Sequence, residues 1–506
     1  MATVEPVLAA EAIQGNILRG FAAGHLALVG LGLPNAQAAA RDYVRALASR
    51  LTSLRATHAL RLVRSAGLAM PGAHRSFLNV GFSFPGIGRL GLSTGGIQDP
   101  FFQVPMGKLA GALNDPLDVS GRPLNYEMGA DWAQTPDLVL IVGADSNDDL
   151  DSAVASEIAA ATAQGCTFHS DQRGAKLPGD IEHFGFRDGI SQVGPRGRLS
   201  AAANDYLTPR FFTEGDTVAL TMAKPGQPLV WPGQFIFGYE NSDPDSLAVP
   251  GDSAEGGEPW MRNGSFLVYR RLRQDVAAFR TFGASAAQAL TASLGRAVGA
   301  EEAEALLVGR WADGTPLLPS PLSPDPALAA DDLRVNNFDY RTATPELTVV
   351  DGTATRTLPV VPADRAGQRC PMFAHVRKVN PRGMPTDQAG LTATFQMLRR
   401  GMPFGPLYAD APDAERGLLF LAYMSSVERQ FRLLTAQWMN NPAAPEVGAT
   451  GHDMLVGQAD AGQPRQCTMK DALGNPKAAL STTERWVIPT GGAVLFALAI
   501  DTLAAL

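Results

Sequence analysis

Strand-like apolar runs and helix-like amphipathic runs alternate along the chain, and the same order occurs in both halves. In the first half, the strand-like runs are HLALVGLGL, SFLNVGFSF and DLVLIVGAD. The helix-like runs there are NAQAAARDYVRALASRLTSL, opened by a capping Asn35, and DDLDSAVASEIAAATA. In the second half, GSFLVYRRL precedes QDVAAFRTFGA, GLLFLAYMS precedes VERQFRLLTAQWMNN, and GAVLFALAI supplies a closing strand.

This repeated order predicts an α+β fold. Strand–helix units that recur twice per half, with intervening strands, are typical of two ferredoxin-like units, each an antiparallel sheet with helices on one face. We expect the first unit to span residues 1–225 and the second residues 226–506. Two such sheets facing each other would leave a cleft between them, which is a common place for a ligand.

Composition and charge exclude several classes of protein. The 506 residues carry a formal net charge of −8 and the basic residues are scattered, so we expect neither nucleic acid nor a membrane as a partner. The cysteines are far apart with no CxxC pair, which argues against a thiolate metal cage and a disulfide framework. Because the first residues lack the pattern of a secretory signal, and the apolar C-terminal run is short and interrupted by Asp501, we expect a cytoplasmic protein.

The stretch GDIEHFGFRDGISQVGP raises the first question of chemistry. It places Asp188 beside Gly189, among Phe184, Phe186 and Ile190. An Asp-Gly pair between apolar residues is a common turn signal, and in that interpretation Asp188 faces water without a chemical role. Alternatively, the carboxylate lies against an apolar wall, where its proton affinity suits acid–base chemistry.

A single histidine stands in an unusual setting. His375 follows the apolar run Met372–Ala374 and precedes Arg377, Lys378 and Arg382 in CPMFAHVRKVNPRGMP. An apolar collar with cations nearby suits a planar, hydrophobic cofactor that carries carboxylates. Haem is such a cofactor, and one neutral imidazole is its usual proximal ligand in peroxidases and globins.

Two adjacent arginines follow in the apolar segment FQMLRRGMPFG. A buried arginine needs an anionic partner or a functional reason, so Arg399 and Arg400 are candidates for a site. If their neighbours were polar, a solvent-exposed basic patch would explain both arginines and the His375 segment equally well.

These segments resemble a known family. EHFGFRDGISQ is similar to the GxxDG signature of dye-decolorising peroxidases, CPMFAHVRKVNPR resembles that family's proximal-histidine segment, and RRGMPFGP resembles its distal-arginine segment. Further similar segments occur in the family's order: IQGNILRGF, WPGQFIFGY, NGSFLVYRRLRQDV, LLFLAYMSSVERQFRLLTAQWMNNP and PTGGAVLFA. The length resembles the long-chain subgroup. The resemblance implies a pair of ferredoxin-like units of the dimeric α+β barrel type, with haem in a cleft between sheet and helices.

The resemblance also assigns the reacting residues. His375 takes the role of the proximal iron ligand, and Asp188 and Arg399 form the distal pair. Asp453, in GHDMLVGQ, is the candidate carboxylate that accepts the second imidazole N–H, although the family usually shows proline where Met454 stands. Arg399 is preferred to Arg400 because neighbouring strand residues point to opposite faces and the family places the first arginine over the iron.

Four further residues are expected to contact the cofactor. His183 resembles the family's haem-contacting histidine and is expected at a propionate, as is the cation Arg377. Leu418 and Phe420, two residues apart on a strand, share a face and are expected to form the apolar part of the distal wall.

The implied function is a haem peroxidase with one haem b per chain. It would reduce hydrogen peroxide and oxidise bulky aromatic donors such as dyes and phenols by one-electron steps, as a monomer or homodimer. Because an aspartate stays deprotonated in mild acid, we expect an acidic pH optimum. The alternative is a haem-binding or haem-handling protein with only weak peroxidase activity, since fold does not fix function. The sequence does not select which tryptophan or tyrosine, if any, is a surface oxidation site.

Overall fold

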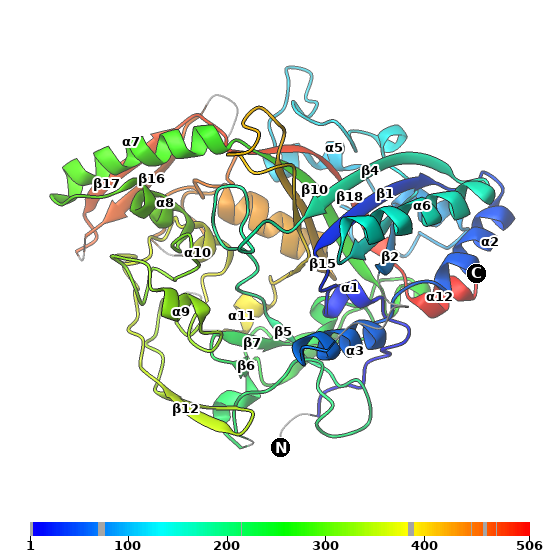
Figure 1. The fold of residues 1–506 in the computed structure, drawn as a ribbon, viewed down its shortest axis with the longest axis horizontal. Helices are drawn as coiled ribbons and strands as arrows, with labels where there is room; N and C mark the ends of the chain where they lie inside the picture. Colours follow the sequence, from blue (N-terminus) through cyan, green and yellow to red (C-terminus); the bar gives the residue numbers. More distant parts are fainter. Residues whose placement is uncertain are drawn as a thin grey trace.

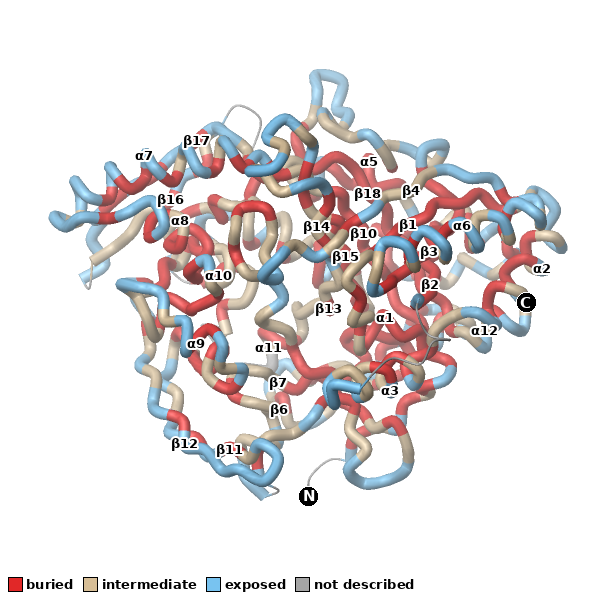
Figure 2. The backbone as a smooth tube through the Cα atoms, in the orientation of Figure 1, coloured by how far each residue is buried: buried red, intermediate tan, exposed pale blue. Residues whose placement is uncertain are grey.

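The structure is a computed structural model, which describes residues 4–68, 76–213, 215–382, 389–446, 448–458, 463–471 and 473–506. Its core is an antiparallel sheet of nine strands with helices on both sides (Figure 1). Buried backbone is concentrated in this sheet and in the faces packed on it, whereas the outer turns of the helices are exposed (Figure 2).

The N-terminal unit has the order strand, helix, strand, strand, helix, strand. Its strands pair in the order β2-β3-β1-β4, all antiparallel, which is the ferredoxin-like arrangement. The elements are β1 (His25–Gly32), α2 (Gln37–Ala48), α3 (Leu54–Ser65), β2 (Ser76–Phe82), β3 (Leu138–Ala144), α6 (Asn147–Ala163) and β4 (Thr167–Ala175).

The first predicted helix is two helices, and Asn35 is not its cap. The residue before α2 is Ala36, which makes no side-chain capping bond, while the Asn35 side chain accepts a hydrogen bond from Arg89. The helix α2 ends at Ala48, and Ser53 starts a new one: its hydroxyl accepts the N–H of Ala56 at the first turn of α3.

The C-terminal unit repeats the arrangement with larger insertions. Its strands pair in the order β13-β15-β10-β18, and β14 pairs with β15 beside β13. The elements are β10 (Ser265–Gln274), α7 (Val276–Leu294), α8 (Ala300–Val308), β13 (Leu398–Arg399), β14 (Met402–Phe404), β15 (Gly417–Met424), the π-helix η6 (Val427–Met439) and β18 (Val487–Ala497).

The two units share one sheet, and buried apolar side chains fill the space that the sheet encloses. In the middle of the sheet, β18 pairs with β2 through Phe496 and Phe82. The two outer edges of the sheet also approach each other, because β4 lies against β14: a Cβ on Gly174 would fall 2.7 Å from the Pro403 carbonyl oxygen. The sheet therefore curls without closing, and its inner face holds one buried apolar cluster, including Leu28 and Leu421. The expected cleft between facing sheets is thus filled, and the ligand-sized cavity lies on the outer face of the C-terminal strands.

Shorter elements complete the described part. The remaining α-helices are α1 (Gly15–Leu18), α4 (Phe84–Arg89), α5 (Met106–Leu109), α9 (Pro326–Ala330), α10 (His375–Val379), α11 (Ala389–Ala393) and α12 (Ile500–Ala504). The 3-10 turns are η1 (Gly111–Leu113), η2 (Trp132–Gln134), η3 (Thr217–Leu220), η4 (Pro232–Gln234) and η5 (Pro259–Met261). The small sheets are β5 (Gly194–Pro195) with β7 (Gln227–Val230) and β6 (Met222–Lys224), β8 (Glu240–Ser242) with β9 (Pro250–Ser253), β11 (Leu347–Asp351) with β12 (Ala354–Leu358), and β16 (Arg465–Lys470) with β17 (Pro476–Thr482).

The segment between the two sets of strands carries much of the site. The N-terminal strands end at Ala175 and the C-terminal strands begin at Ser265, so a boundary at residue 225 stays a prediction. Asp188 lies in this connecting segment. In the part of the chain that the structure describes, no helix is long and apolar enough to cross a membrane.

Candidate active site

A cavity of about 340 Å³ lies between the outer face of the C-terminal strands and the helices α10 and η6. Its sheet wall follows from strand register. On β10 and β15, Arg270 pairs with Phe420 and Leu272 with Leu418, and alternate residues of each strand face the same side. All four line the cavity, so Leu418 and Phe420 form an apolar wall as expected from their spacing.

His375 stands on the opposite wall, at the start of α10. Its Nδ1 donates a hydrogen bond of 2.7 Å to Oδ2 of Asp453, a fully buried carboxylate. Oδ1 of the same carboxylate accepts the N–H groups of Leu455 and Val456, so Asp453 is itself held in place. With Nδ1 engaged, the ring's second nitrogen, Nε2, remains for a ligand in the cavity that His375 lines.

The pair is electrostatically coupled. Burial alone would lower the pKa of His375, but the charge of Asp453 and the hydrogen bond to it raise that pKa above its ordinary value. Burial would likewise raise the pKa of Asp453, and the charge of His375 with its hydrogen bond lowers it on balance. The imidazole is therefore oriented by a carboxylate and made a more basic ligand.

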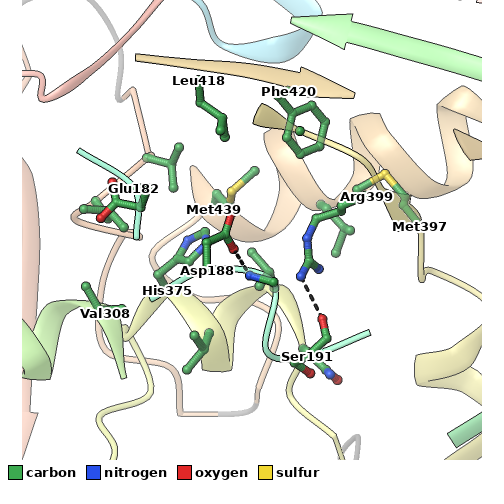
Figure 3. A pocket seen from close by; sticks show the side chains of 18 of the residues that line it. Glu182, Asp188, Ser191, Val308, His375, Met397, Arg399, Leu418, Phe420 and Met439 are labelled. Carbon is green, nitrogen blue, oxygen red and sulfur yellow. Dashed lines mark hydrogen bonds between the residues drawn. The ribbon is translucent and has the colours of Figure 1, made fainter. Parts of the chain in front are cut away.

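Asp188 faces the cavity from a tight turn. Its Oδ1 accepts the N–H of Gly189 at 2.6 Å, and its backbone N–H donates to the Asp180 carbonyl. Gly189 has φ +74°, in the left-handed region that glycine adopts without strain, so the turn interpretation describes the backbone correctly. The same turn brings the carboxylate into the cavity wall, so the turn geometry does not exclude a chemical role for Asp188 (Figure 3).

Arg399 and Arg400 point in different directions. Arg399 lines the cavity, and its guanidinium donates to the Ser191 carbonyl at 2.8 Å (Figure 3). Arg400 instead donates to the carbonyls of Asn16 and Ile17, and its burial there lowers its pKa to about 9. The alternation of a strand thus separates the two arginines.

The segment that carries Asp188 also holds Arg399 by hydrogen bonds. Two residues of the GISQ run after Asp188 hold Arg399: Ser191 accepts from its guanidinium, and the Gln192 amide donates to its carbonyl at 2.8 Å. Both charges act on His375 across the cavity, since Arg399 lowers and Asp188 raises the pKa of that imidazole. The structure therefore brings Asp188 and Arg399 together and sets them opposite His375.

Arg377 is not placed as expected. Its side chain is fully buried outside the cavity lining, where Nε and the terminal nitrogen bind both oxygens of Glu446 at 2.6 and 2.9 Å. It also donates to the Asp364 and Cys370 carbonyls and lies over the Tyr340 ring at 4.4 Å. This placement corrects the expectation of a cofactor contact, because residue 377 lies on the face of α10 that turns into the protein.

His183 is also outside the lining. Its Nε2 hydrogen-bonds the Phe404 carbonyl at 2.8 Å, and its buried Nδ1 has no hydrogen-bond partner within the described residues. Its neighbours Glu182 and Phe184 line the cavity instead. The histidine therefore ties the turn to β14, and its expected contact with a propionate stays a prediction.

Comparisons with known proteins agree with this geometry. Residues 235–446 match the family model for the C-terminal part of Dyp-type peroxidases. The dye-decolorising peroxidase msp1 of Mycetinis scorodonius is 30% identical over 448 residues, which cover 84% of this chain and 75% of the relative. That of Exidia glandulosa is 30% identical, with 84% of this chain and 74% of the relative covered.

The chain belongs to the dye-decolorising peroxidase family. A multifunctional dye peroxidase from an Amycolatopsis species is 28% identical, with 90% of this chain and 87% of that protein covered. Among solved structures, an ancestral D-type dye-decolorising peroxidase has a TM-score of 0.77 and 28% identity, with 98% of both chains covered. A dye-decolorising peroxidase in complex with 2,6-dimethoxyphenol has a TM-score of 0.73 and 28% identity, with 99% of both covered. The fold of this family, antiparallel ferredoxin-like sheets with helices, is confirmed.

Dye-decolorising peroxidases are haem enzymes, and the cavity fits that cofactor. Haem takes one imidazole as its proximal ligand and presents an apolar disc and carboxylates to the protein. His375 offers the imidazole, and Leu418 and Phe420 offer an apolar wall.

Three other arginines provide a cationic part of the wall. Arg310 and Arg382 both donate to Oδ1 of Asn336, and Arg187 donates to the Ala329 carbonyl. All three line the cavity, and within the described residues none forms an ion pair with a carboxylate. Burial, with the nearby charge of Arg382, lowers the pKa of Arg310 to about 10, as expected for guanidinium groups without an anion. Arg187 and Arg382 lie close in sequence to the predicted site residues Asp188 and His375. Only the fold shows that they line the same cavity as Arg310.

Proposed function

We propose that this chain binds one haem b in the cavity, reduces hydrogen peroxide and oxidises bulky aromatic donors such as dyes and phenols by one-electron steps. The observation that carries the proposal is that the segment of Asp188 also holds Arg399, through Ser191 and Gln192, so that both charges stand opposite His375. A haem carrier has no need of a matched base and cation. The 2,6-dimethoxyphenol complex of the structurally similar peroxidase supports a phenolic donor.

His375 would hold the iron through Nε2, and Asp453 would hold the imidazole. Arg187, Arg310 and Arg382 would receive the cofactor's carboxylates, because a buried guanidinium without an ion pair favours an anion. Leu418 and Phe420 would cover the peroxide side with apolar groups and exclude bulky donors from it. When bound, haem supplies the iron that takes up peroxide and passes on oxidising equivalents.

The residues opposite His375 handle the proton and the charge. Hydrogen peroxide carries one proton on each oxygen, and Asp188 accepts the proton of one oxygen and returns it to the other. This transfer lets the second oxygen leave as water. Negative charge that develops on the leaving oxygen is stabilised by the guanidinium of Arg399, which the Ser191 carbonyl holds in position. Aspartates in general have a lower intrinsic pKa than histidines, and on that ground we propose an acidic pH optimum.

An absorption experiment tests this proposal. The purified protein, loaded with hemin, is mixed with one equivalent of hydrogen peroxide and then with 2,6-dimethoxyphenol. We expect a Soret band that shifts with peroxide and returns with the phenol. A Soret band that only bleaches would support haem binding without organised peroxide chemistry, and no band after loading would refute the cofactor assignment.

A further inference from the structure

Glu182 is a carboxyl group of the cavity wall that the steps above do not use. Its Oε2 accepts the backbone N–H of Phe184 at 3.0 Å and the side-chain amide of Gln274 at 2.5 Å. Its Oε1 accepts the N–H of Phe186 at 3.0 Å. Gln274 is on β10, two residues from Leu272 and on the same cavity face. Glu182 therefore joins the turn of Asp188 to the sheet wall.

The partner of Glu182 can serve either protonation state. Oε1 of Gln274 is buried and has no hydrogen-bond partner within the described residues. A half-turn of the side-chain amide exchanges its oxygen and nitrogen. The NH₂ group of Gln274 donates to an ionised Glu182, and after the half-turn Oε1 accepts the O–H of a protonated Glu182. A carboxylate whose sole role was to hold the turn in place would need only the NH₂ group of Gln274, not its Oε1.

The surroundings of Glu182 disfavour a permanent charge. Burial, with the nearby charge of Asp188, raises its pKa to about 7, while the two N–H groups and Gln274 act in the opposite direction. The other charged groups of the cavity include Arg270 on β10, Arg399 on β13 and His375 on α10. The cavity is also lined by Asp115, Arg187, Arg310 and Arg382. Among the main causes of the raised pKa of Glu182, the nearby charge is that of Asp188.

We propose that Glu182, paired with Gln274, is a second proton-exchanging carboxyl group of this cavity and supplies a proton for the reduction of peroxide. When electrons come from a donor outside the cavity, the balance is H₂O₂ + 2 e⁻ + 2 H⁺ → 2 H₂O: the O–O bond breaks and two O–H bonds form. Asp188 only moves a proton that peroxide already carries. Glu182 releases one of the added protons, becomes a carboxylate, and regains a proton from solvent. The use of this proton rests on the proposed peroxidase function, whereas its presence on Glu182 does not.

Infrared difference spectroscopy of the haem-loaded protein between pH 5.5 and pH 8.5 tests the inference. Ordinary glutamates and aspartates, with pKa values near 4, are ionised at both pH values and give no difference band. Burial also raises the pKa of Glu304, on α8, to about 7, and it raises that of Asp99, so a protonated-carboxyl band is assigned by its loss in a variant. Glu182→Gln should remove one band that is present at the lower pH, and the matched control Glu304→Gln should remove a different one.

The same variants separate a proton donor from a structural clamp. With substoichiometric peroxide and an external donor, Glu182→Gln should abolish an inflection near pH 7 in the rate of the Soret change, and Glu304→Gln should leave it in place. A wild-type spectrum with no band that Glu182→Gln removes would overturn the proposal, because Glu182 would then be ionised throughout. An inflection that survives in Glu182→Gln would also overturn it.

A second variant covers the case in which Glu182→Gln does not fold. Gln274→Met removes a donor that favours the ionised form of Glu182, so the midpoint of the Glu182 band should move up by roughly one pH unit. An unchanged midpoint contradicts the pairing. Loss of peroxidase activity in the wild type would refute the proposed function and leave the infrared result standing, so the two failures are distinguishable.

Discussion

Replacement of Arg377 distinguishes a structural cation from a cofactor contact. Arg377→Met leaves Glu446, which is 3% exposed, as a buried carboxylate without its bidentate partner. Breaking a buried pair by removing one member costs about 3–5 kcal/mol, and the contact with the Tyr340 ring is lost as well. We expect a loss of this size in the free energy of unfolding, with little change in the affinity of the folded protein for hemin.

The assay is urea unfolding of the haem-loaded protein, followed by tryptophan fluorescence, together with hemin titration of each variant at low urea. The double variant Arg377→Met/Glu446→Leu is the control. It removes the unpaired carboxylate and should recover a large part of the stability, because a buried ion pair replaced by apolar groups is often neutral. A variant with unchanged unfolding but weakened hemin binding would refute the assignment of Arg377 to the protein interior.

Three further predictions concern the site itself. Asp188→Asn should slow the peroxide-driven Soret change in stopped flow by about 10²–10⁴-fold and Arg399→Leu by about 10²–10³-fold, both with unchanged haem content; a parallel loss of haem would favour the carrier alternative. Asp453 stabilises the fold above the ordinary carboxyl pKa of about 3.9, and this contribution is lost as the pH falls through its lower folded value. Acid unfolding should therefore be less steep in Asp453→Asn, and equal steepness would contradict the ion pair with His375. Arg382→Met should weaken binding of hemin but not of hemin dimethyl ester, as measured by titration, and equal losses for both would exclude a contact with the carboxylates.

The fold was predictable wherever apolar periodicity and strand length agreed. All six strand-like runs are strands, and the run DDLDSAVASEIAAATA is the helix α6, which Ser146 caps. The break between α2 and α3 was missed because the apolar stripe continues through it, and only the capping bond of Ser53 marks the new start. The curl of the sheet, which fills the expected cleft with core, depends on the distant approach of β4 and β14, and no local pattern records such an approach.

The site was predictable where a residue type has one plausible role. A lone histidine in an apolar collar, a carboxylate in a glycine turn and an arginine in a strand all stand in the cavity wall. The arginines after His375 were harder to assign, because local sequence does not say which face of a short helix turns inward. Arg310 carried no local signal, since it is distant in sequence from Arg382 and meets it only through Asn336.

The orientation of α10 determines which of the nearby cationic side chains face the cavity and which are buried in the protein. The helix begins at His375, so residues 376 and 379 share its cavity side, whereas Arg377 and Lys378 turn inward and bind Glu446 and backbone carbonyls. The chain then reverses at Arg382, whose φ of +58° returns a guanidinium to the cavity. A left-handed residue other than glycine costs about 1 kcal/mol or more, and here the hydrogen bonds of Arg382 to the Asn336 and Phe338 carbonyls offset that cost. The backbone conformation at Arg382 therefore directs a guanidinium into the cavity, whereas Arg377 directs its charge into the protein.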